Sequence, residues 1–322
     1  MNGIKLCGTG AAAPAKVVTN DDMAAMVETN DEWITTRTGI KERRYCTDET
    51  LLSLCTAAAR QAMDRAGISP ADLGVCLVAT ISPDFITPAV SCLLQRELGL
   101  PEDCLCMDLN AACSGFLYGL HTAQCLLDAC PRKYGLVVGG EAFTRLVDFT
   151  DRTTCILFGD GAGAAVVRSG PDCPVLHTVV GARGDEKVLN VPGAGTGVPQ
   201  YIHMEGTAVF KFAVETVPKC ITQVLEQAHM TAEDIDLFVL HQANERIIDR
   251  VVKNLHLPPE KCPKNIAKYG NTSAASIPLL LHELCASGAL KPGMRALLSG
   301  FGGGLTWGGA ILELDGETCK KI

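Results

Sequence analysis

The sequence lacks the long hydrophobic run that a membrane-spanning helix requires. No stretch of about 20 consecutive apolar residues occurs, and the first residues, MNGIKLCGTG, contain no apolar signal-peptide core. From these absences we expect a cytoplasmic protein without a membrane partner. Its 16 cysteines are then mostly reduced thiols.

An excess of positive charge and a zinc-binding pattern are also missing. The formal net charge is -8, so we expect no nucleic-acid partner. Pairs such as Cys104/Cys106 and Cys125/Cys130 do not make a CxxC…CxxC pattern, and we expect no metal site. The segment FGDGAG at 158–163 lacks the spacing of a phosphate-binding loop and is interpreted as a tight turn between strands.

The sequence contains enough apolar residues to form a large hydrophobic core. Of the 322 residues, 47% are hydrophobic and 20% are charged, which is typical of a compact chain. This length predicts two domains or one duplicated domain.

Helix and strand patterns alternate along the chain. Apolar residues between positions 51 and 66 keep to one helical face, and Gly67 is a helix-ending residue. The continuous apolar run Val75 to Ala79 is typical of a parallel strand covered on both faces. The pattern predicts an α/β protein.

An internal repeat divides the sequence. Residues 66–79 correspond without a gap to residues 228–241, which lie 162 positions later. Two further helix–strand units, which lead to strands at 135–139 and 296–300, repeat at a register of about 161. We therefore predict two similar halves, 1–172 and 173–322. Chance similarity of helix–strand units is the alternative.

Cys113 is a candidate nucleophile. Apolar alternation predicts a strand over 105–109, small residues at 110–112 predict a turn, and helical spacing follows. Unpaired N–H groups and the positive dipole at a helix N-terminus favour a thiolate. The alternative is a buried structural cysteine.

Two polar residues in the second half could meet Cys113. His241 follows the predicted strand 237–240, and Asn271 stands in YGNTSAAS before a predicted helix. Sites in open α/β sheets form beyond the carboxyl ends of strands, where two related halves can face each other. Taken singly, His241 could be a backbone-bonded strand end and Asn271 a helix cap.

Four motifs stand at or near these residues and the C-terminal glycine turn: AACSGF around Cys113, HQAN at 241–244, GNTSAAS at 270–276 and FGGGLTWG at 301–308. Together they resemble those of one enzyme family, β-ketoacyl-acyl-carrier-protein synthase III, which starts type II fatty-acid synthesis. The resemblance extends from TNDEWITTRTGIKER near the N-terminus to the C-terminal strand. It implies the thiolase fold, a duplicated five-layer αβαβα architecture, and a homodimer.

The resemblance also implies a mechanism. Cys113 would take an acyl group from acyl-CoA, and malonyl-acyl-carrier-protein would lose CO2 to give the carbanion that attacks the acyl thioester. A neutral His241 and Asn271 would donate hydrogen bonds to the enolate oxygen. The N–H groups of Cys113 and Gly303 would form the oxyanion hole, with the glycine turn Gly302–Gly304 allowing close approach. Acyl-CoA is a substrate, and no cofactor is expected.

Binding residues are implied in the same way. For CoA, Trp33 and Arg152 would sandwich the adenine, and Thr29 and Arg37 would contact the phosphates; the alternative is a core tryptophan with solvated arginines. Contacts to the acidic carrier protein would come from a basic mouth and its central segment: Lys211, Gln242, Ala243, Asn244, Glu245, Arg246, Arg250 and Lys253. A solvated helix face is the alternative there.

One position bears on the acyl chain. Thr87 precedes Pro88 where some family members carry a bulky aromatic residue. A small residue at the floor of an acyl pocket would leave room for longer or branched primers. Neighbouring Phe85 and Ile86 could refill that space.

Other functions are alternatives to this one. A related enzyme of secondary metabolism could use another acceptor on the same fold, and a non-catalytic homologue could merely bind acyl-CoA or the carrier. A thiolase would need a second cysteine near the C-terminus, where this chain has FGGGLTWG. A papain-like protease is disfavoured because Cys113 lacks the CGSCW setting.

Overall fold

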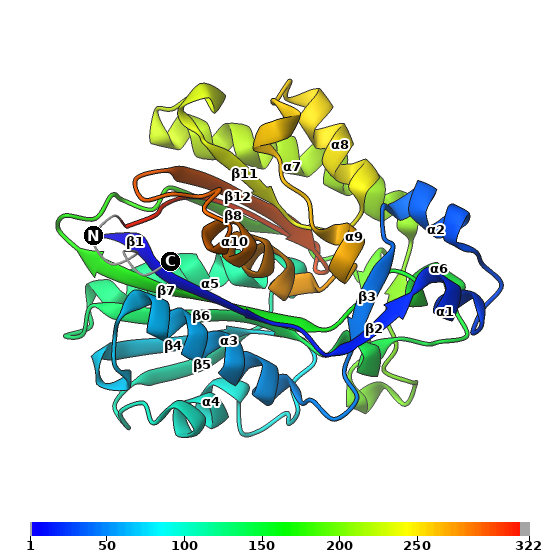
Figure 1. The fold of residues 1–322 in the computed structure, drawn as a ribbon, viewed down its shortest axis with the longest axis horizontal. Coiled ribbons are helices and arrows are strands. Elements are labelled where there is room, and N and C mark those ends of the chain that lie inside the picture. The colour runs from blue at the N-terminus through cyan, green and yellow to red at the C-terminus, as the bar shows by residue number, and fades with distance from the viewer. Residues whose placement is uncertain (1, 316–322) are drawn as a thin grey trace.

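A computed structural model describes residues 2–315, and its strands form two main sheets (Figure 1). The larger has the order β1–β7–β6–β4–β5 and the smaller β11–β12–β13–β8. The strands of these sheets are β1 (Gly3–Ala12), β4 (Leu73–Ala79), β5 (Leu105–Leu109), β6 (Tyr134–Glu141), β7 (Gly161–Gly170), β8 (Thr178–Ala182), β11 (Leu237–Leu240), β12 (Arg295–Gly302) and β13 (Thr306–Glu313). Two short ribbons pair β2 (Lys16–Thr19) with β3 (Glu42–Tyr45) and β9 (Leu189–Asn190) with β10 (His203–Met204).

The two sheets share one topology. β4 pairs with β6 in parallel as β11 pairs with β12, while β7 and β13 each lie antiparallel between two strands of their sheet. The duplication predicted from the repeat is therefore confirmed in the fold. In residues 2–315, β5 has no counterpart in the smaller sheet. The exact boundary at 172/173 stays a prediction.

Helices cover both sheets and fill the space between them (Figure 1). α5 and α10 lie in the middle, α3 and α4 cover the outer face of the larger sheet, and α7 and α8 cover that of the smaller. This is the five-layer αβαβα order. The helices are α1 (Asn20–Ala24), α2 (Asp31–Thr38), α3 (Leu51–Ala66), α4 (Val90–Leu98), α5 (Gly115–Asp128), α6 (Arg152–Cys155), α7 (Gly206–Ala228), α8 (Glu245–Asn254), α9 (Ile266–Tyr269) and α10 (Ser276–Ala286).

The repeated turn after α3 and α7 explains why the halves fold alike. α3 ends at Gly67, and the Ser69 amide and hydroxyl then donate to Asp72 Oδ2 at 2.8 and 2.7 Å. After α7, Thr231 and Asp234 repeat the arrangement at 2.8 and 2.9 Å. Each capping turn leads the chain into a central parallel strand, β4 or β11.

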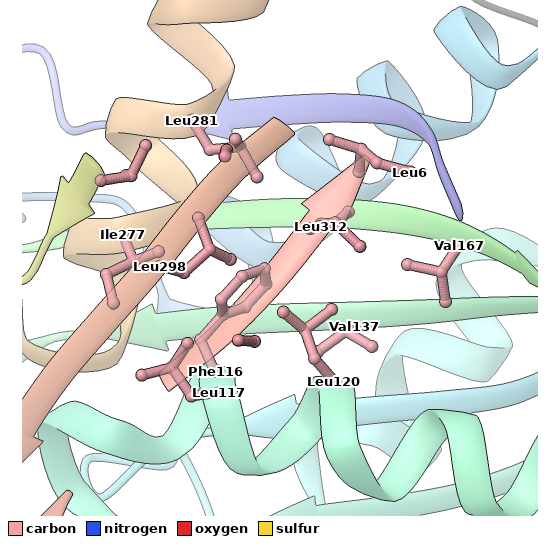
Figure 2. Close-up of a cluster of buried hydrophobic side chains, with 14 of the residues drawn as sticks. Leu6, Phe116, Leu117, Leu120, Val137, Val167, Ile277, Leu281, Leu298 and Leu312 are labelled. Carbon is pink, nitrogen blue, oxygen red and sulfur yellow. The ribbon is translucent and has the colours of Figure 1, made fainter. Parts of the chain in front are cut away.

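Strand β4 shows why both faces of the sheet are apolar. Val75 and Leu77 point into the central layer, and Cys76 and Val78 point toward the outer helices. Figure 2 shows the central layer, where leucines and a phenylalanine of α5 meet residues of α10 and β12. Because side chains alternate along a strand, a doubly covered strand is apolar throughout, as its sequence predicts.

One smaller expectation needs correction. The segment 158–163 is not simply a turn, because β7 begins at Gly161 and Phe158 forms a β-bridge with Asn271 of the other half. In residues 2–315 no helix is both long and apolar enough to cross a bilayer.

Candidate active site

A cavity of about 930 Å3 opens between the two halves and brings the predicted residues together. Cys113, His241 and Asn271 all line it, although they lie far apart in the sequence. Gly302 and Gly303 line it too. The cavity is thus bounded by the elements that follow β5, β11 and β12, at the carboxyl ends of these strands.

Two equivalent elbows form the base of this cavity. The short 3-10 turn Ala112–Ser114 leads into α5, and the turn Ser273–Ala275 leads into α10. Ala112 and Ser273, which lie 161 positions apart, have positive φ angles of 46° and 49°. Such angles are uncommon outside glycine and cluster at functional sites. They mark the same sharp strand-to-helix reversal in both halves.

The Cys113 thiol is neutral in the free protein. Burial is the main effect on Cys113 and raises the pKa of its thiol to about 12. Among the smaller effects, hydrogen bonds from the Ser273 hydroxyl and the Cys113 N–H lower this pKa, and the charge of Glu141 raises it. The expectation that the helix end would favour a thiolate is therefore wrong, because desolvation outweighs the dipole. Deprotonation has to accompany the reaction.

His241 is neutral as well. Its side chain is 3% exposed, and burial lowers its pKa to about 3. Its Nδ1 lies 2.6 Å from the Ser276 hydroxyl on α10. When Ser276 donates to Nδ1, the ring proton is on Nε2, which makes that nitrogen the hydrogen-bond donor.

Asn271 is oriented by the backbone around it. Its Oδ1 accepts from the Ser273 N–H at 2.9 Å, which leaves the Nδ2 amino group to donate. Its own N–H donates to Leu157 O at 2.8 Å, and its carbonyl accepts from Gly159 N at 3.0 Å. These bonds fix a donor amide at the cavity wall.

The glycine turn requires glycine at one position in particular. A Cβ on Gly302 would lie 2.6 Å from the Cys113 nitrogen, whereas a Cβ on Gly303 would meet nothing closer than 3.5 Å. The Thr306 hydroxyl lies 2.9 Å from Ala111 O and 3.1 Å from Gly303 O. Thr306 thus joins the glycine turn to the loop that carries Cys113.

The residues expected to hold CoA form a surface patch. The guanidinium carbons of Arg37 and Arg152 lie 4.8 and 5.4 Å from the Trp33 ring centroid. The buried Thr29 hydroxyl has no hydrogen-bond partner within residues 2–315. Asn244, which lines the cavity, donates to Arg37 O at 3.1 Å, so the patch adjoins the cavity mouth.

The residues expected to meet the carrier fall into three groups. Ala243 and Asn244 line the cavity. The four expected cations are exposed, and they are Lys211, Arg246, Arg250 and Lys253. Glu245 contacts Lys264 in an ion pair of 2.5 Å.

The side chain of Gln242 is enclosed, and its expected contact with the carrier stays a prediction. It is 1% exposed; its Nε2 donates to Leu240 O at 2.8 Å, and its Oε1 accepts from the backbone of Asn265 and Ile266. A side chain so enclosed holds the segment in place and has no free group for a partner.

Thr87 is placed less favourably than expected. It is exposed in the single chain and does not line the cavity, although its neighbour Ile86 does. Its role at an acyl-pocket floor stays a prediction.

Three polar residues around the site were not singled out from the sequence. Ser273 and Ser276 lie within the GNTSAAS motif, so their proximity to Asn271 was a usable signal. Glu141, a fully buried glutamate at the end of β6, gave no signal beyond its place after an apolar strand.

Comparisons with known proteins agree with this geometry. Residues 107–184 match the family model for 3-oxoacyl-[acyl-carrier-protein] synthase III, and residues 225–314 match that for its C-terminal part. The β-ketoacyl-[acyl-carrier-protein] synthase III of Clostridium acetobutylicum is 42% identical over 97% of this chain and 99% of its own. The crystal structure of the 3-oxoacyl-[acyl-carrier-protein] synthase III of Aquifex aeolicus is 43% identical, with a TM-score of 0.92 over 97% of this chain and 100% of that one. The priming β-ketosynthase of the R1128 polyketide pathway is 35% identical, with a TM-score of 0.93 over 98% and 97% of the two chains.

Replacing Gly302 by alanine should impair acyl transfer to Cys113. The added Cβ would collide with the Cys113 nitrogen and displace the N–H that is expected to serve in the oxyanion hole, which should lower the rate by about 100-fold. The measurement is the single-turnover acylation of Cys113 by acetyl-CoA, followed by mass spectrometry. Gly195→Ala is the control, because no atom lies within 4 Å of its Cβ. Unimpaired acylation of Gly302→Ala would contradict the close approach.

Replacing Ser276 by alanine should separate the two half-reactions. Without the Ser276 hydroxyl the His241 tautomer is no longer fixed, so condensation should fall by about 10- to 100-fold. Acylation of Cys113 should be unchanged. Ser287→Ala, at the other end of α10, is the matched control. Equal losses in both half-reactions would show that Ser276 only supports the fold.

Proposed function

The chain belongs to the 3-oxoacyl-[acyl-carrier-protein] synthase III family, and we propose that its cavity condenses an acyl-CoA primer with malonyl-acyl-carrier-protein. The observation that carries this proposal is the convergence of Cys113, His241 and Asn271 in one cavity between the halves. A neutral imidazole and an amide beside a thiol suit stabilisation of a developing enolate.

In the first half-reaction Cys113 attacks the thioester carbonyl of the primer. The developing oxyanion accepts hydrogen bonds from the N–H groups of Cys113 and Gly303, which the close approach of Gly302 brings together. CoA leaves, and the acyl group stays on Cys113 as a thioester.

In the second half-reaction malonyl-acyl-carrier-protein loses CO2. His241 Nε2–H and the Asn271 amino group donate to its thioester oxygen, so the electron pair released from the carboxylate is held as an enolate. A neutral histidine can donate without protonating the carbanion, and the low pKa of His241 keeps it neutral. The carbanion attacks the acyl-Cys113 carbonyl to give the 3-oxoacyl product.

The patch around Trp33 suits the nucleotide end of CoA. An adenine stacked on the indole would lie near the guanidinium groups of Arg37 and Arg152, whose charges also suit phosphates. Thr29, whose buried hydroxyl has no hydrogen-bond partner among residues 2–315, would contact the same ligand. From this patch the pantetheine arm would pass Asn244 into the cavity.

The exposed cations around the mouth suit an acidic carrier protein. Arg246 lies 6.0 Å from the ring of Phe210, a cavity-lining residue, and Arg250 and Lys253 continue along α8. Opposite charges across such a surface raise the association rate more than the final affinity. A cytoplasmic location, expected from the sequence, remains part of this proposal.

Two copies of the chain would pair along β5. This strand is an edge of the larger sheet, and its Leu105 and Met107 are 43% and 36% exposed. Phe85 and Ile86, also exposed, belong to the loop between β4 and α4. An uncovered edge with apolar side chains is a template for another strand, and we propose that a second copy supplies it.

The similarity to the R1128 priming β-ketosynthase favours one second candidate, a condensing enzyme of polyketide synthesis with another carrier. Both candidates share acylation of Cys113. They differ in which malonyl-carrier accepts the acyl group.

The deciding experiment measures both half-reactions with acetyl-, isobutyryl- and octanoyl-CoA and malonyl-acyl-carrier-protein of fatty-acid synthesis. We expect 3-oxoacyl product from wild type, none from Cys113→Ala, and a raised KM for the carrier alone in Arg250→Glu. Acceptance of the longer or branched primers would support the Thr87 prediction, and exclusive use of acetyl-CoA would refute it. Acylation without product would favour the polyketide candidate.

Charge at the edge strand should prevent pairing of two chains. Met107→Lys places an ammonium group in the middle of the proposed interface, where burying it is costly. Light scattering after size exclusion should show a dimer for wild type and a monomer for this variant. Met26→Lys, at a 49% exposed position on another surface, is the control. A monomeric wild-type protein would contradict the proposed pairing of two chains along β5.

A further inference from the structure

A buried carboxylate near Cys113 has no part in the mechanism above. Glu141 is fully buried and accepts hydrogen bonds from the loop after β4: Ser82 Oγ at 2.5 Å, Thr80 Oγ1 at 3.2 Å and Ile81 N at 3.2 Å. Ser273 Oγ, from the elbow of the other half, donates at 3.1 Å. Among the ion pairs of residues 2–315, none involves Glu141.

Ser273 connects this carboxylate to the nucleophile. Because its hydroxyl proton is directed to Glu141, its oxygen lone pairs are left for the Cys113 S–H. Ser273 lines the same cavity as Cys113, and the elbow that carries Ser273 packs against the elbow that carries Cys113. Thiol, hydroxyl and carboxylate thus form one series across the two halves.

We propose that Glu141, acting through the Ser273 hydroxyl, takes up the proton of the Cys113 thiol on acylation and returns it after condensation. This inference rests on the proposed function. Glu141 touches neither substrate, so it is a positioning residue that acts on Cys113 through Ser273.

Protons and bonds balance with water as the further reactant. On acylation the thiol proton moves to Ser273 Oγ while the Ser273 proton moves to Glu141; the sulfur bonds to the acyl carbon, and CoA leaves as a thiolate that takes a proton from water. On condensation the new C–C bond forms and the acyl–sulfur bond breaks. The Cys113 thiolate then regains the proton from Glu141 by the reverse path.

The surroundings of Glu141 suit such an exchange. Burial raises the pKa of Glu141 to about 7, and the hydrogen bonds from Ser82, Ile81, Ser273 and Thr80 lower it in part. A group that titrates near neutral pH can both accept and return a proton. Besides burial, the charge of Glu141 raises the pKa of two thiols, Cys55 on α3 and Cys113. Asp84, in the same loop as Ser82, is paired with Arg145 at 2.7 Å.

The test is the single-turnover rate of Cys113 acylation by acetyl-CoA between pH 5.5 and 9 in the full chain. In wild type the rate should rise as pH passes about 7, because only ionised Glu141 accepts the proton. Glu141→Gln and Ser273→Ala should each be about 100-fold slower at pH 8 and lack this rise. Ala112, with a φ of 46° at the equivalent position, shows that alanine tolerates the elbow geometry.

The double variant distinguishes a proton relay from a purely structural role of Glu141 and Ser273. Glu141→Gln with Ser273→Ala should be no slower than either single variant, since both remove the same path. Asp160→Asn is the matched control: this carboxylate is also fully buried, but it bonds to Cys46 and Thr144. Its variant should keep the rise near pH 7.

Several outcomes would overturn the inference. A rise near pH 7 retained in either single variant, or multiplied losses in the double variant, would do so. If Glu141→Gln does not fold, Ser273→Ala decides alone. A wild-type protein that no acyl-CoA acylates would refute the proposed function as well, whereas normal acylation with an unchanged pH profile in Ser273→Ala would refute the relay only.

Discussion

Reciprocal close packing between the halves is the constraint on which the site depends. A Cβ on Gly139 of β6 would lie 2.1 Å from Ala274 O in the second elbow, and a Cβ on Gly302 of β12 would lie 2.6 Å from Cys113 N in the first. Each half therefore presents a glycine strand end to the elbow of the other. Larger residues would separate the elbows, and with them Cys113 from Asn271.

The same packing sets the electrostatics of the cavity. Burial raises the pKa of Cys113 and Glu141 and lowers that of His241, so all three tend toward their neutral forms near pH 7. Charge then develops only when substrate is bound, on atoms that fixed donors already face. A carbanion formed in such a site has few proton sources nearby, and condensation is favoured over protonation.

Sequence patterns predicted the helices and strands whose faces and ends are set by residues close together in the chain. The predicted bounds were exact for three elements: the helix 51–66 and the strands 105–109 and 237–240. There the spacing of the apolar residues and the residues that end each element indicate the same bounds. The sign of the Cys113 pKa shift was missed, since the helix end is visible in sequence but the opposite half that desolvates the thiol is not. The burial of Gln242 was missed for the same reason: a polar residue beside a strand gives no sign of burial.

The duplicated halves have diverged in chemistry while keeping their geometry. At the register of 161, Cys113 corresponds to Ala274 and Ala112 to Ser273, so each elbow carries one functional residue where the other carries alanine. In the proposed mechanism the first elbow supplies the nucleophile, and the second supplies the hydroxyl and, two residues earlier, the donor amide. One scaffold thus places a sulfur and its partners face to face, because two copies of the same reversal meet at one point in the fold.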